Sequence, residues 1–356
     1  MNKIQKTDHF YLIDGSGYIF RAYYALPPLT RKSDGLPTGA VSGFCSMLFK
    51  LLEDSKSSEN LQKPTHFAVI FDSARKTFRN EIYSDYKANR SEAPDDLAPQ
   101  FEYIRKSVLA FSLPSVELIN YEADDLIATY VDQILSAGAK VTIVSSDKDL
   151  MQLFKKNVRI FDPMKNNFIN NEDIKNKFGV DSNKIIDVQS LAGDSSDNVP
   201  GVPGIGVKTA AELINKYGTL EKLLESAHEI KQNKRRETLI ENKDKAIISK
   251  KLVSLKLDAP IDKELKHVLQ VLYSVNDPFD SPDSSTPVLD PNPNFFSLLT
   301  SFVQFLFAFT QSCKFTFLEN SFSSSFLDAV PMALIMLPCL PRMMPFWLLD
   351  SVIIAA

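Results

Sequence analysis

The sequence predicts an α/β fold built on a mostly parallel β-sheet with helices on both faces. Short apolar runs, typical of buried strands, alternate with helical patterns, and each of three such runs leads into an aspartate. Strands that alternate with helices indicate a parallel sheet, and such sheets bind ligands beyond the carboxyl ends of their strands. A hydrophobic content of 44% is sufficient for the core of this fold.

The three apolar runs end before Asp14, Asp72 and Asp147, the last after two serines. One aspartate after a strand is common, because aspartate starts turns and caps helices. Three aspartates at the ends of neighbouring strands instead indicate a shared ligand site. The runs span residues 10–13, 67–71 and 141–144.

Helical patterns are expected over residues 41–53 and 123–137. The second helix begins with Glu122, Asp124 and Asp125. Because residues three apart share a helix face, Glu122 and Asp125 are expected to project together. Acids at a helix start also complement the helix dipole, so this cluster alone has an ordinary structural explanation.

We expect three segments along the chain. Residues 1–180 hold the strands, residues 181–275 are helical with a Gly/Pro-rich interruption, and residues 276–356 differ in composition. The last segment has 12 of the 25 phenylalanines, two basic residues and no clear amphipathic periodicity, so we expect it to be poorly ordered. Its uncharged stretch, residues 294–313, is near the length of a membrane span, but its Ser, Thr and Gln disfavour a membrane helix.

The formal net charge of −4 conceals an uneven distribution, since the first 275 residues are close to neutral and densely charged. Such a balance permits a phosphate-handling enzyme without requiring one. The three cysteines form no close pair and no metal-binding spacing, which indicates a reducing compartment. The polar N-terminus lacks an apolar signal segment, so we expect a cytoplasmic protein.

Nine carboxylates occupy strand ends or helix starts. If they converge, each pair about 4 Å apart costs roughly 4 kcal/mol at an effective dielectric near 20, and only cations offset that repulsion. Oxygen ligands without His or Cys favour Mg²⁺ or Mn²⁺ over Zn²⁺, and two such ions support phosphodiester hydrolysis. The nine are Asp14, Asp72, Glu122, Asp124, Asp125, Asp147, Asp149, Asp194 and Asp197.

Two further segments have the character of a nucleic-acid-binding surface. Residues 78–90 interleave aromatic with basic side chains, which suits base stacking and phosphate contacts, although an amphipathic surface helix has the same composition. Residues 201–206 have the GxxGxG spacing of a helix-hairpin-helix, followed by Lys208 and Thr209. Its N–H groups and the next helix N-terminus suit phosphate binding, and a plain helix–helix turn is the alternative.

The order of these motifs resembles the flap endonuclease family, and most closely the 5′→3′ exonuclease domain at the N-terminus of bacterial DNA polymerase I. The likeness covers roughly residues 8–260 and implies a PIN-like sheet with a helical arch and a helix-hairpin-helix (helix-three-turn-helix) subdomain. The motifs are Asp14-Gly-Ser-Gly, Phe71-Asp72, Phe78-Arg79, Tyr86-Lys87-Ala-Asn-Arg90, Glu122-Ala-Asp124-Asp125, Asp147-Lys-Asp149 and Gly193-Asp194-Ser-Ser-Asp197, followed by the hairpin.

The resemblance implies roles for the residues at matching positions. The ligands of one metal ion would be Asp14, Asp72, Glu122 and Asp124. The second ion or its shell would be served by Asp125, Asp147, Asp149, Asp194 and Asp197. The scissile phosphate would be contacted by Lys87 and Arg90, and the DNA by Arg21, Arg79 and Tyr86. The duplex backbone, with a monovalent cation such as K⁺, would be held by Gly201, Gly204, Gly206, Lys208 and Thr209.

The predicted function is therefore metal-dependent hydrolysis of DNA near 5′ ends, flaps and nicks, and of RNA primers, in replication and repair. Residues 276–356 resemble neither a proofreading nor a polymerase domain, so we expect no DNA synthesis and a separate DNA polymerase as partner. A frameshift is one hypothesis for this tail. Alternatives are an RNA-directed PIN-type nuclease, an inactive DNA-binding remnant of a truncated or frameshifted polymerase, and a membrane-attached protein. The hairpin disfavours the RNA-directed nuclease, and the complete carboxylate set disfavours the inactive remnant. A membrane-attached protein would leave the acid cluster unexplained.

Overall fold

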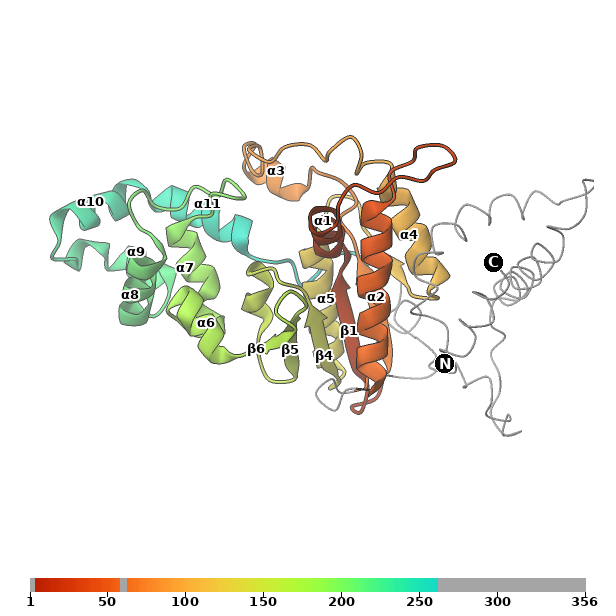
Figure 1. Ribbon diagram of the computed structural model, residues 1–356. Helices are drawn as coiled ribbons and strands as arrows, with labels where there is room; N and C mark the ends of the chain where they lie inside the picture. Colours follow the sequence, from red (N-terminus) through yellow and green to blue (C-terminus); the bar gives the residue numbers. More distant parts are fainter. Residues whose placement is uncertain (1–3, 58–62, 262–356) are drawn as a thin grey trace, which may run out of the picture. The chain divides into compact units, whose positions relative to one another are not determined.

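The computed structural model describes residues 4–57 and 63–261 (Figure 1). These residues fall into two compact units. The first comprises residues 4–18, 63–93 and 113–261, and the second comprises residues 19–57 and 94–112. The boundary predicted near residue 180 falls inside the first unit. The predicted tail, residues 276–356, lies outside the described residues, as does its uncharged stretch.

A six-stranded sheet in the order β3-β2-β1-β4-β5-β6 forms the centre of the first unit (Figure 1). Four of its pairings are parallel, and only β6 runs antiparallel to its neighbour. The predicted mostly parallel α/β fold is thus confirmed. The strands are β1 (His9–Asp14), β2 (His66–Ile70), β3 (Ser115–Val116), β4 (Lys140–Val144), β5 (Val158–Asp162) and β6 (Asn167–Ile169).

The three predicted strands are the neighbours β2, β1 and β4 at the middle of the sheet. Asp14, the last residue of β1, is in register with Ile70 of β2, and Ile13 is in register with Val144 of β4. Because all three strands run in the same direction, the acids that follow them lie at one edge of the sheet, as predicted.

Burial on both faces explains why β1 is an almost continuous apolar run. Phe10 and Leu12 belong to one core cluster together with Leu126 and Tyr130 of α5 (Ala123–Ser136), which packs against β1 and β4. The intervening Tyr11 is also buried, on the opposite face. Strands buried on both sides lose the alternation of polar and apolar residues.

The rest of the first unit is mainly helical, as predicted for the segment that begins at residue 181 and is described as far as residue 261. Helix α7 packs against α8 and α11, and the Gly/Pro-rich interruption separates α7 from α8. The helices are α3 (Phe78–Ile82), α6 (Asn171–Phe178), α7 (Ile185–Ala192), α8 (Val207–Tyr217), α9 (Leu220–Glu225), α10 (Asn233–Glu241) and α11 (Lys243–Val253), with the 3₁₀ turns η1 (Asp149–Leu153), η2 (Ser182–Lys184) and η3 (Ala227–Glu229).

The basic segment 78–90, which holds positions that the resemblance assigned to a helical arch, is helical only in its first five residues. Helix α3 ends at Ile82, because Tyr83 adopts an extended backbone, and turns follow as far as Arg90. Lys87 has a φ of 55°, which no right-handed helix accommodates. Residues 83–90 therefore reach the acids as a series of turns and not as a helix.

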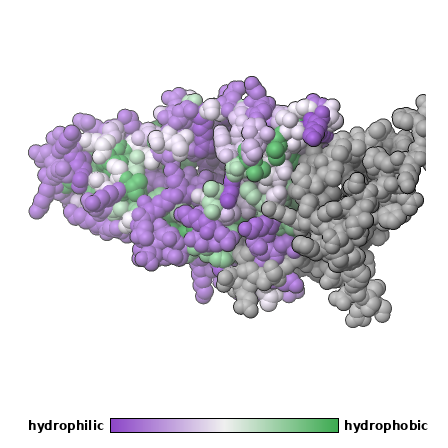
Figure 2. All heavy atoms as spheres, in the orientation of Figure 1, coloured by the Kyte–Doolittle hydropathy of each residue, from purple (hydrophilic) through white to green (hydrophobic). Residues whose placement is uncertain are grey.

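The second unit contains α2 (Gly39–Ser57) and α4 (Gln100–Ala110), which pack together. Helix α1 (Gly15–Ala25) starts in the first unit and continues into the second. The side-chain oxygen of Gln100 accepts the N–H of Val41 at 3.1 Å and so links the two helix starts. None of the described helices combines the length and apolar character that a bilayer crossing requires. Hydrophilic residues cover most of the described surface on the side drawn in Figure 2.

Candidate active site

Asp14 is held firmly at the end of the central strand. Its carboxylate accepts the N–H of Gly17 and the hydroxyl of Ser145, each at 2.8 Å. A side chain at position 17 would place its Cβ 2.6 Å from Oδ2 of Asp14, so only glycine allows helix α1 to start this close to the carboxylate. Ser145, which sequence reasoning missed, also accepts the N–H of Asp147 at 3.0 Å.

Asp72 joins the end of β2 to the start of α5. Its Oδ1 accepts the N–H of Ala123 at 2.8 Å, and its own N–H donates to the hydroxyl of Ser16 at 3.0 Å. This carboxylate therefore caps the helix that carries Asp124. The ordinary capping role and membership of an acidic site are both realised at this residue.

Asp147 and Asp149 follow β4. Oδ1 of Asp147 accepts the N–H of Asp149 at 2.8 Å, and the side-chain amide of Gln189 donates to Asp149 at 2.6 Å. Gln189 is a second residue that the sequence did not reveal, because α7, which carries it, is distant in the chain. It ties the helical part of the unit to the acidic edge of the sheet.

Five carboxylates at this edge repel one another. Burial and, after it, repulsion from Asp147, Asp14, Asp72 and Asp149 raise the pKa of Asp124 well above its usual range. Burial first, opposed by its two hydrogen bonds and assisted by its acidic neighbours, raises the pKa of Asp14 to about 6. Burial and then Asp147 raise the pKa of Asp149 to about 6. Among the described residues, Asp124 accepts no hydrogen bond that would relieve its charge.

This group has the donor chemistry of a divalent metal site. All its donors are carboxylate oxygens, which suit Mg²⁺ or Mn²⁺. Within residues 4–57 and 63–261, no three acidic, histidine or cysteine side chains form a ready-made metal cage. The same five carboxylates nevertheless lie close enough to repel one another, and bound cations would neutralise that repulsion. In charge and chemistry, these residues therefore fit the predicted ions.

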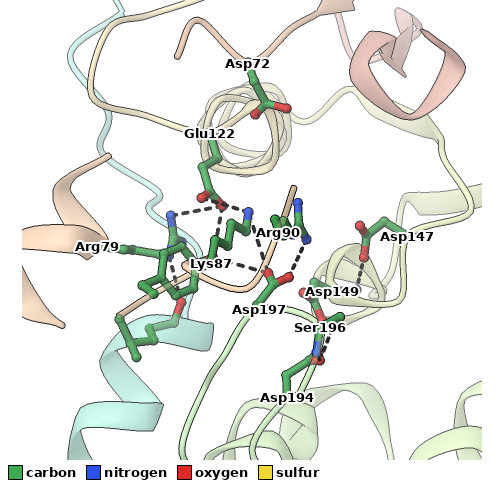
Figure 3. Close-up of polar contacts among 12 residues, drawn as sticks. Asp72, Arg79, Lys87, Arg90, Glu122, Asp147, Asp149, Asp194, Ser196 and Asp197 are labelled. Atoms are coloured by element: carbon green, nitrogen blue, oxygen red, sulfur yellow. Dashed lines mark hydrogen bonds and ion pairs between the residues drawn. The ribbon is translucent and has the colours of Figure 1, made fainter. Parts of the chain in front are cut away.

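Two other predicted ligands are paired with basic side chains of the segment that follows α3 (Figure 3). Nζ of Lys87 lies 2.8 Å from Oε1 of Glu122 and 3.6 Å from Oδ2 of Asp197, and Arg90 also bonds Asp197. Burial alone would lower the pKa of Lys87, but the charges of Glu122 and Asp197 outweigh burial and raise it. The predicted catalytic cations and these two acids thus neutralise each other.

Asp125 and Glu122 project together, as their spacing predicted, and Nη1 of Arg79 contacts both carboxylates, at 2.6 and 3.6 Å. The guanidinium of Arg79 donates to both oxygens of Asp125, at 2.6 and 2.8 Å, and the N–H of Lys256 donates at 2.9 Å. The exposed fraction is 0% for Asp125 and 1% for Arg79. Since protein donors use both oxygens, this geometry contradicts a direct metal-ligand role for Asp125, and its place in the shell of the second ion stays a prediction.

Arg79 is likewise withdrawn from the position predicted for a DNA contact. Besides Asp125, it donates to the carbonyl oxygens of Leu252 and Ser254 at 2.7 and 3.1 Å. A guanidinium so completely used by the protein cannot reach a phosphate. Arg79 instead fastens the end of α11 to the start of α5.

Asp194 and Tyr86 also have partners inside the protein. Lys148 and the hydroxyl of Ser196 bond Asp194 and, against the effect of burial, lower its pKa. The hydroxyl of Tyr86 lies 3.3 Å from Oε2 of Glu122 and 3.4 Å from Oδ2 of Asp197, and the ring is 5% exposed. In this conformation Tyr86 offers no face on which a DNA base can stack, contrary to the prediction.

The hairpin between α7 and α8 has one glycine that packing requires and two that are open. Gly201 has a φ of 57°, and a Cβ there would lie 2.5 Å from the N of Gly193. Gly204 and Gly206 are exposed with no neighbour within 4 Å of a Cβ. Lys208 is exposed in the first turn of α8, with Thr209 half-buried beside it. Contact of this hairpin with DNA stays a prediction.

Arg21 lies in the second compact unit. Its contact with DNA also stays a prediction. Lys148, by contrast, is a charged residue that the prediction omitted although it stands between two predicted ligands. Its pairing with Asp194 depends on a contact between η1 and the loop after α7, which no local pattern shows.

Comparison with known proteins identifies both parts of the chain. The model of the 5′-3′ exonuclease N-terminal resolvase-like domain matches residues 9–179, and that of the 5′-3′ exonuclease C-terminal SAM fold matches residues 180–274. A solved structure of the bacteriophage T5 D15 protein, co-crystallised with metal ions, has a similar fold, with a TM-score of 0.58 and 21% identity over 69% of this chain and 89% of that one.

The relatives include separate exonucleases and much longer polymerases. DNA polymerase I of Rhizobium leguminosarum is 57% identical over 263 residues, 74% of this chain but 26% of the relative, so the chain spans about a quarter of that protein. The 5′-3′ exonuclease of Buchnera aphidicola is 38% identical over 285 residues, 78% of this chain and 97% of the relative. These matches confirm the resemblance that the motif order indicated, and the chain belongs to the 5′-3′ exonuclease family.

Proposed function

We propose that this protein is a structure-specific 5′→3′ nuclease that uses two Mg²⁺ or Mn²⁺ ions to hydrolyse phosphodiester bonds. The single observation that carries the proposal is the group of five mutually repelling carboxylates at the carboxyl edge of the sheet. Such repulsion is costly unless divalent cations neutralise it. The proposed ligands are Asp14, Asp72, Asp124, Asp147 and Asp149.

When bound, the ions would supply an activated water and stabilise the leaving oxygen. The chain's own residues do the remaining work. Hydrogen bonds to Asp14 and Asp149 keep these carboxylates oriented. Lys87 and Arg90 now pair with Glu122 and Asp197. In the reaction they would pair with the scissile phosphate instead. Glu122 and Asp197, freed of those cations, would then be available to the ions.

We infer that the substrates are DNA with 5′ flaps, nicks or 5′ ends, and RNA primers annealed to DNA. A T5 D15 flap endonuclease of similar fold, with a TM-score of 0.57, was solved in a complex with DNA and metal ions. The exposed hairpin glycines and Lys208 would hold the backbone of the duplex, with K⁺ as a candidate counter-ion. A separate DNA polymerase is the proposed partner, and the cytoplasm the proposed location.

The test is cleavage of a 5′-labelled flap substrate by the full chain in Mg²⁺ and in EDTA. Asp124→Asn should abolish Mg²⁺-dependent cutting, because it removes the carboxylate most strongly coupled to the other four. Asp132→Asn, on the same helix α5, is the matched control and should cut like wild type. Cutting that persists in EDTA or in Asp124→Asn would refute the metal mechanism, and a folded wild type that binds flap DNA without cutting would refute the nuclease function.

A further inference from the structure

The basic turns after α3 and the loop after α7 are joined by uncharged contacts as well as by ion pairs. We name residues 83–90 the strap and residues 194–199 the acidic loop. The N–H of Lys87 donates to the carbonyl oxygen of Asp197 at 2.9 Å. The strap is thereby attached to the acidic loop through the backbone of Lys87, the proposed catalytic lysine.

Two asparagines, one on each segment, complete the attachment reciprocally. The side-chain amide of Asn89 on the strap donates to the carbonyl oxygen of Ser195 at 2.6 Å. The amide of Asn198 on the acidic loop donates to the carbonyl oxygen of Asp85 at 2.7 Å. Because a carbonyl oxygen only accepts, the amide nitrogen of each asparagine must face its partner. The two bonds flank Lys87, one on each side.

Two residues of this attachment, which we call the clamp, have a left-handed backbone. Lys87 has a φ of 55° and Asn198 a φ of 56°. Asparagine tolerates this left-handed conformation, but a lysine there costs free energy and persists only where its surroundings fix it. The asparagine bonds supply part of that fixation.

The ion pairs alone are poor candidates for holding the strap. The side chain of Arg90 is 51% exposed, and exposed pairs contribute little in water, whereas the pairs of Lys87 are largely buried. In the proposed reaction the cations of the strap leave Glu122 and Asp197 for the phosphate, so these pairs break when positioning matters most. The bonds of Asn89 and Asn198 involve no charge and are unaffected by that exchange.

We propose that Asn89 and Asn198 are positioning residues that hold the strap on the acidic loop, so that Lys87 and Arg90 stay beside the acidic site throughout the reaction. This role rests on the proposed nuclease function. Neither asparagine touches the reacting atoms in this scheme; both act through Lys87 and Arg90.

The test uses Asn198→Gly, which keeps the left-handed backbone accessible but removes the donor, and Asn89→Ala as a second variant. Asn166→Gly is the matched control, because Asn166 is an exposed asparagine with a φ of 54° in the β5–β6 turn. Hydrogen–deuterium exchange of the strap peptide, measured in EDTA, reports the clamp without catalysis. Single-turnover cleavage at saturating flap DNA, and the KM of the same substrate, report its consequence.

We expect roughly five- to tenfold faster exchange in the strap for each variant, the effect of one lost hydrogen bond, and a similar fall in the cleavage rate. The KM should change less than the rate, and the control should match wild type in both measurements. Faster exchange with an unchanged rate would overturn the positioning role, as would unchanged exchange. If the wild type itself fails to cut, the proposed nuclease function falls and the positioning role with it, whereas altered exchange would still establish the clamp.

Discussion

Arg79 and Asp125 are almost completely buried and form a two-pronged ion pair. Arg79 has two carbonyl oxygens and the Glu122 carboxylate as further partners, and Asp125 accepts two backbone N–H groups. A buried pair of this kind contributes less than its geometry suggests, because both charges have left water. Removing one partner is far more costly, since it strands the other charge in the protein interior.

Arg79→Met should therefore destabilise the protein by roughly 3–5 kcal/mol, measured by urea unfolding. Lys106→Met, which removes an exposed pair with Glu102 on α4, is the control and should cost less than about 1 kcal/mol. The double variant Arg79→Met/Asp125→Leu should recover part of the loss. If Arg79→Met is stable but binds DNA more weakly, Arg79 contacts DNA directly, as first predicted, and the structural role argued from its burial is wrong.

The buried acids predict an unusual pH dependence. The folded-state pKa values of Asp14 and Asp149 are raised from 3.8 to about 6, so the folded protein holds these protons more tightly than the unfolded chain. Their contribution to stability is complete below pH 3.8 and is lost as the pH rises through about 6. In EDTA, the unfolding free energy should therefore fall as the pH rises from about 4 to about 6, and it should change little above that range.

Asp14→Asn checks this prediction, because it removes one of the titrating groups without changing its shape. In EDTA the variant should be more stable than wild type at pH 8 and should show a shallower pH slope in thermal unfolding. Mg²⁺ should stabilise the wild type at pH 8 more than at pH 5, since protons compete with the ion. An Asp14→Asn protein that is less stable than wild type at pH 8 in EDTA would contradict the assignment.

At the scale of elements, the hairpin glycines offer a graded test. Gly201→Ala combines a φ of 57° with a Cβ 2.5 Å from Gly193, so it should cost more than about 2 kcal/mol. Gly204→Ala has a φ of 75° but open space, and should cost about 1 kcal/mol. Gly206→Ala meets neither obstacle but replaces the N-cap of α8, so it should cost only about 0.5 kcal/mol. Equal losses at all three positions, measured by urea unfolding, would show that the hairpin is not held as described.

The elements that could be predicted from sequence are those with their own periodicity. The continuous apolar runs of β1, β2 and β4 are readable because both faces of these strands are buried. β3 has two residues, and β6 has three, so neither offers a pattern. The resemblance implied a helical arch that includes the strap, but contacts with the acidic loop, distant in the chain, accompany its turns.

The site was predictable to the same extent. Parallel strand ends must meet at one edge, so Asp14, Asp72 and Asp147 could be grouped before the structure was known. Local spacing placed Glu122 and Asp125 together but could not show that Arg79 pairs with them. The pairings of Glu122 and Asp197 with the strap are likewise contacts between distant segments. Sequence thus identified the acids but not their partners.

At the scale of the whole molecule, all proposed site residues lie at or before Thr209. The Buchnera exonuclease, matched over 97% of its length, is a relative of about the size of the two matched domains together. A chain ending at residue 275 should therefore fold and cut 5′-flap DNA at the rate of the full chain in the same Mg²⁺ assay. Loss of cutting by a shortened chain that circular dichroism shows to be folded would assign a catalytic contribution to residues 276–356.

The strand order also determines how long β1 waits for a pairing partner during synthesis. β1 is made first, yet it pairs with β4, about 130 residues further along the chain. At a translation rate of about 5–20 residues per second, the hydrogen-bonding edge of β1 waits on the order of ten seconds for its partner to leave the ribosome. An apolar strand with an open edge is a template for incorrect pairing during that interval. The nascent chain should therefore depend on holding chaperones until residue 144 has emerged.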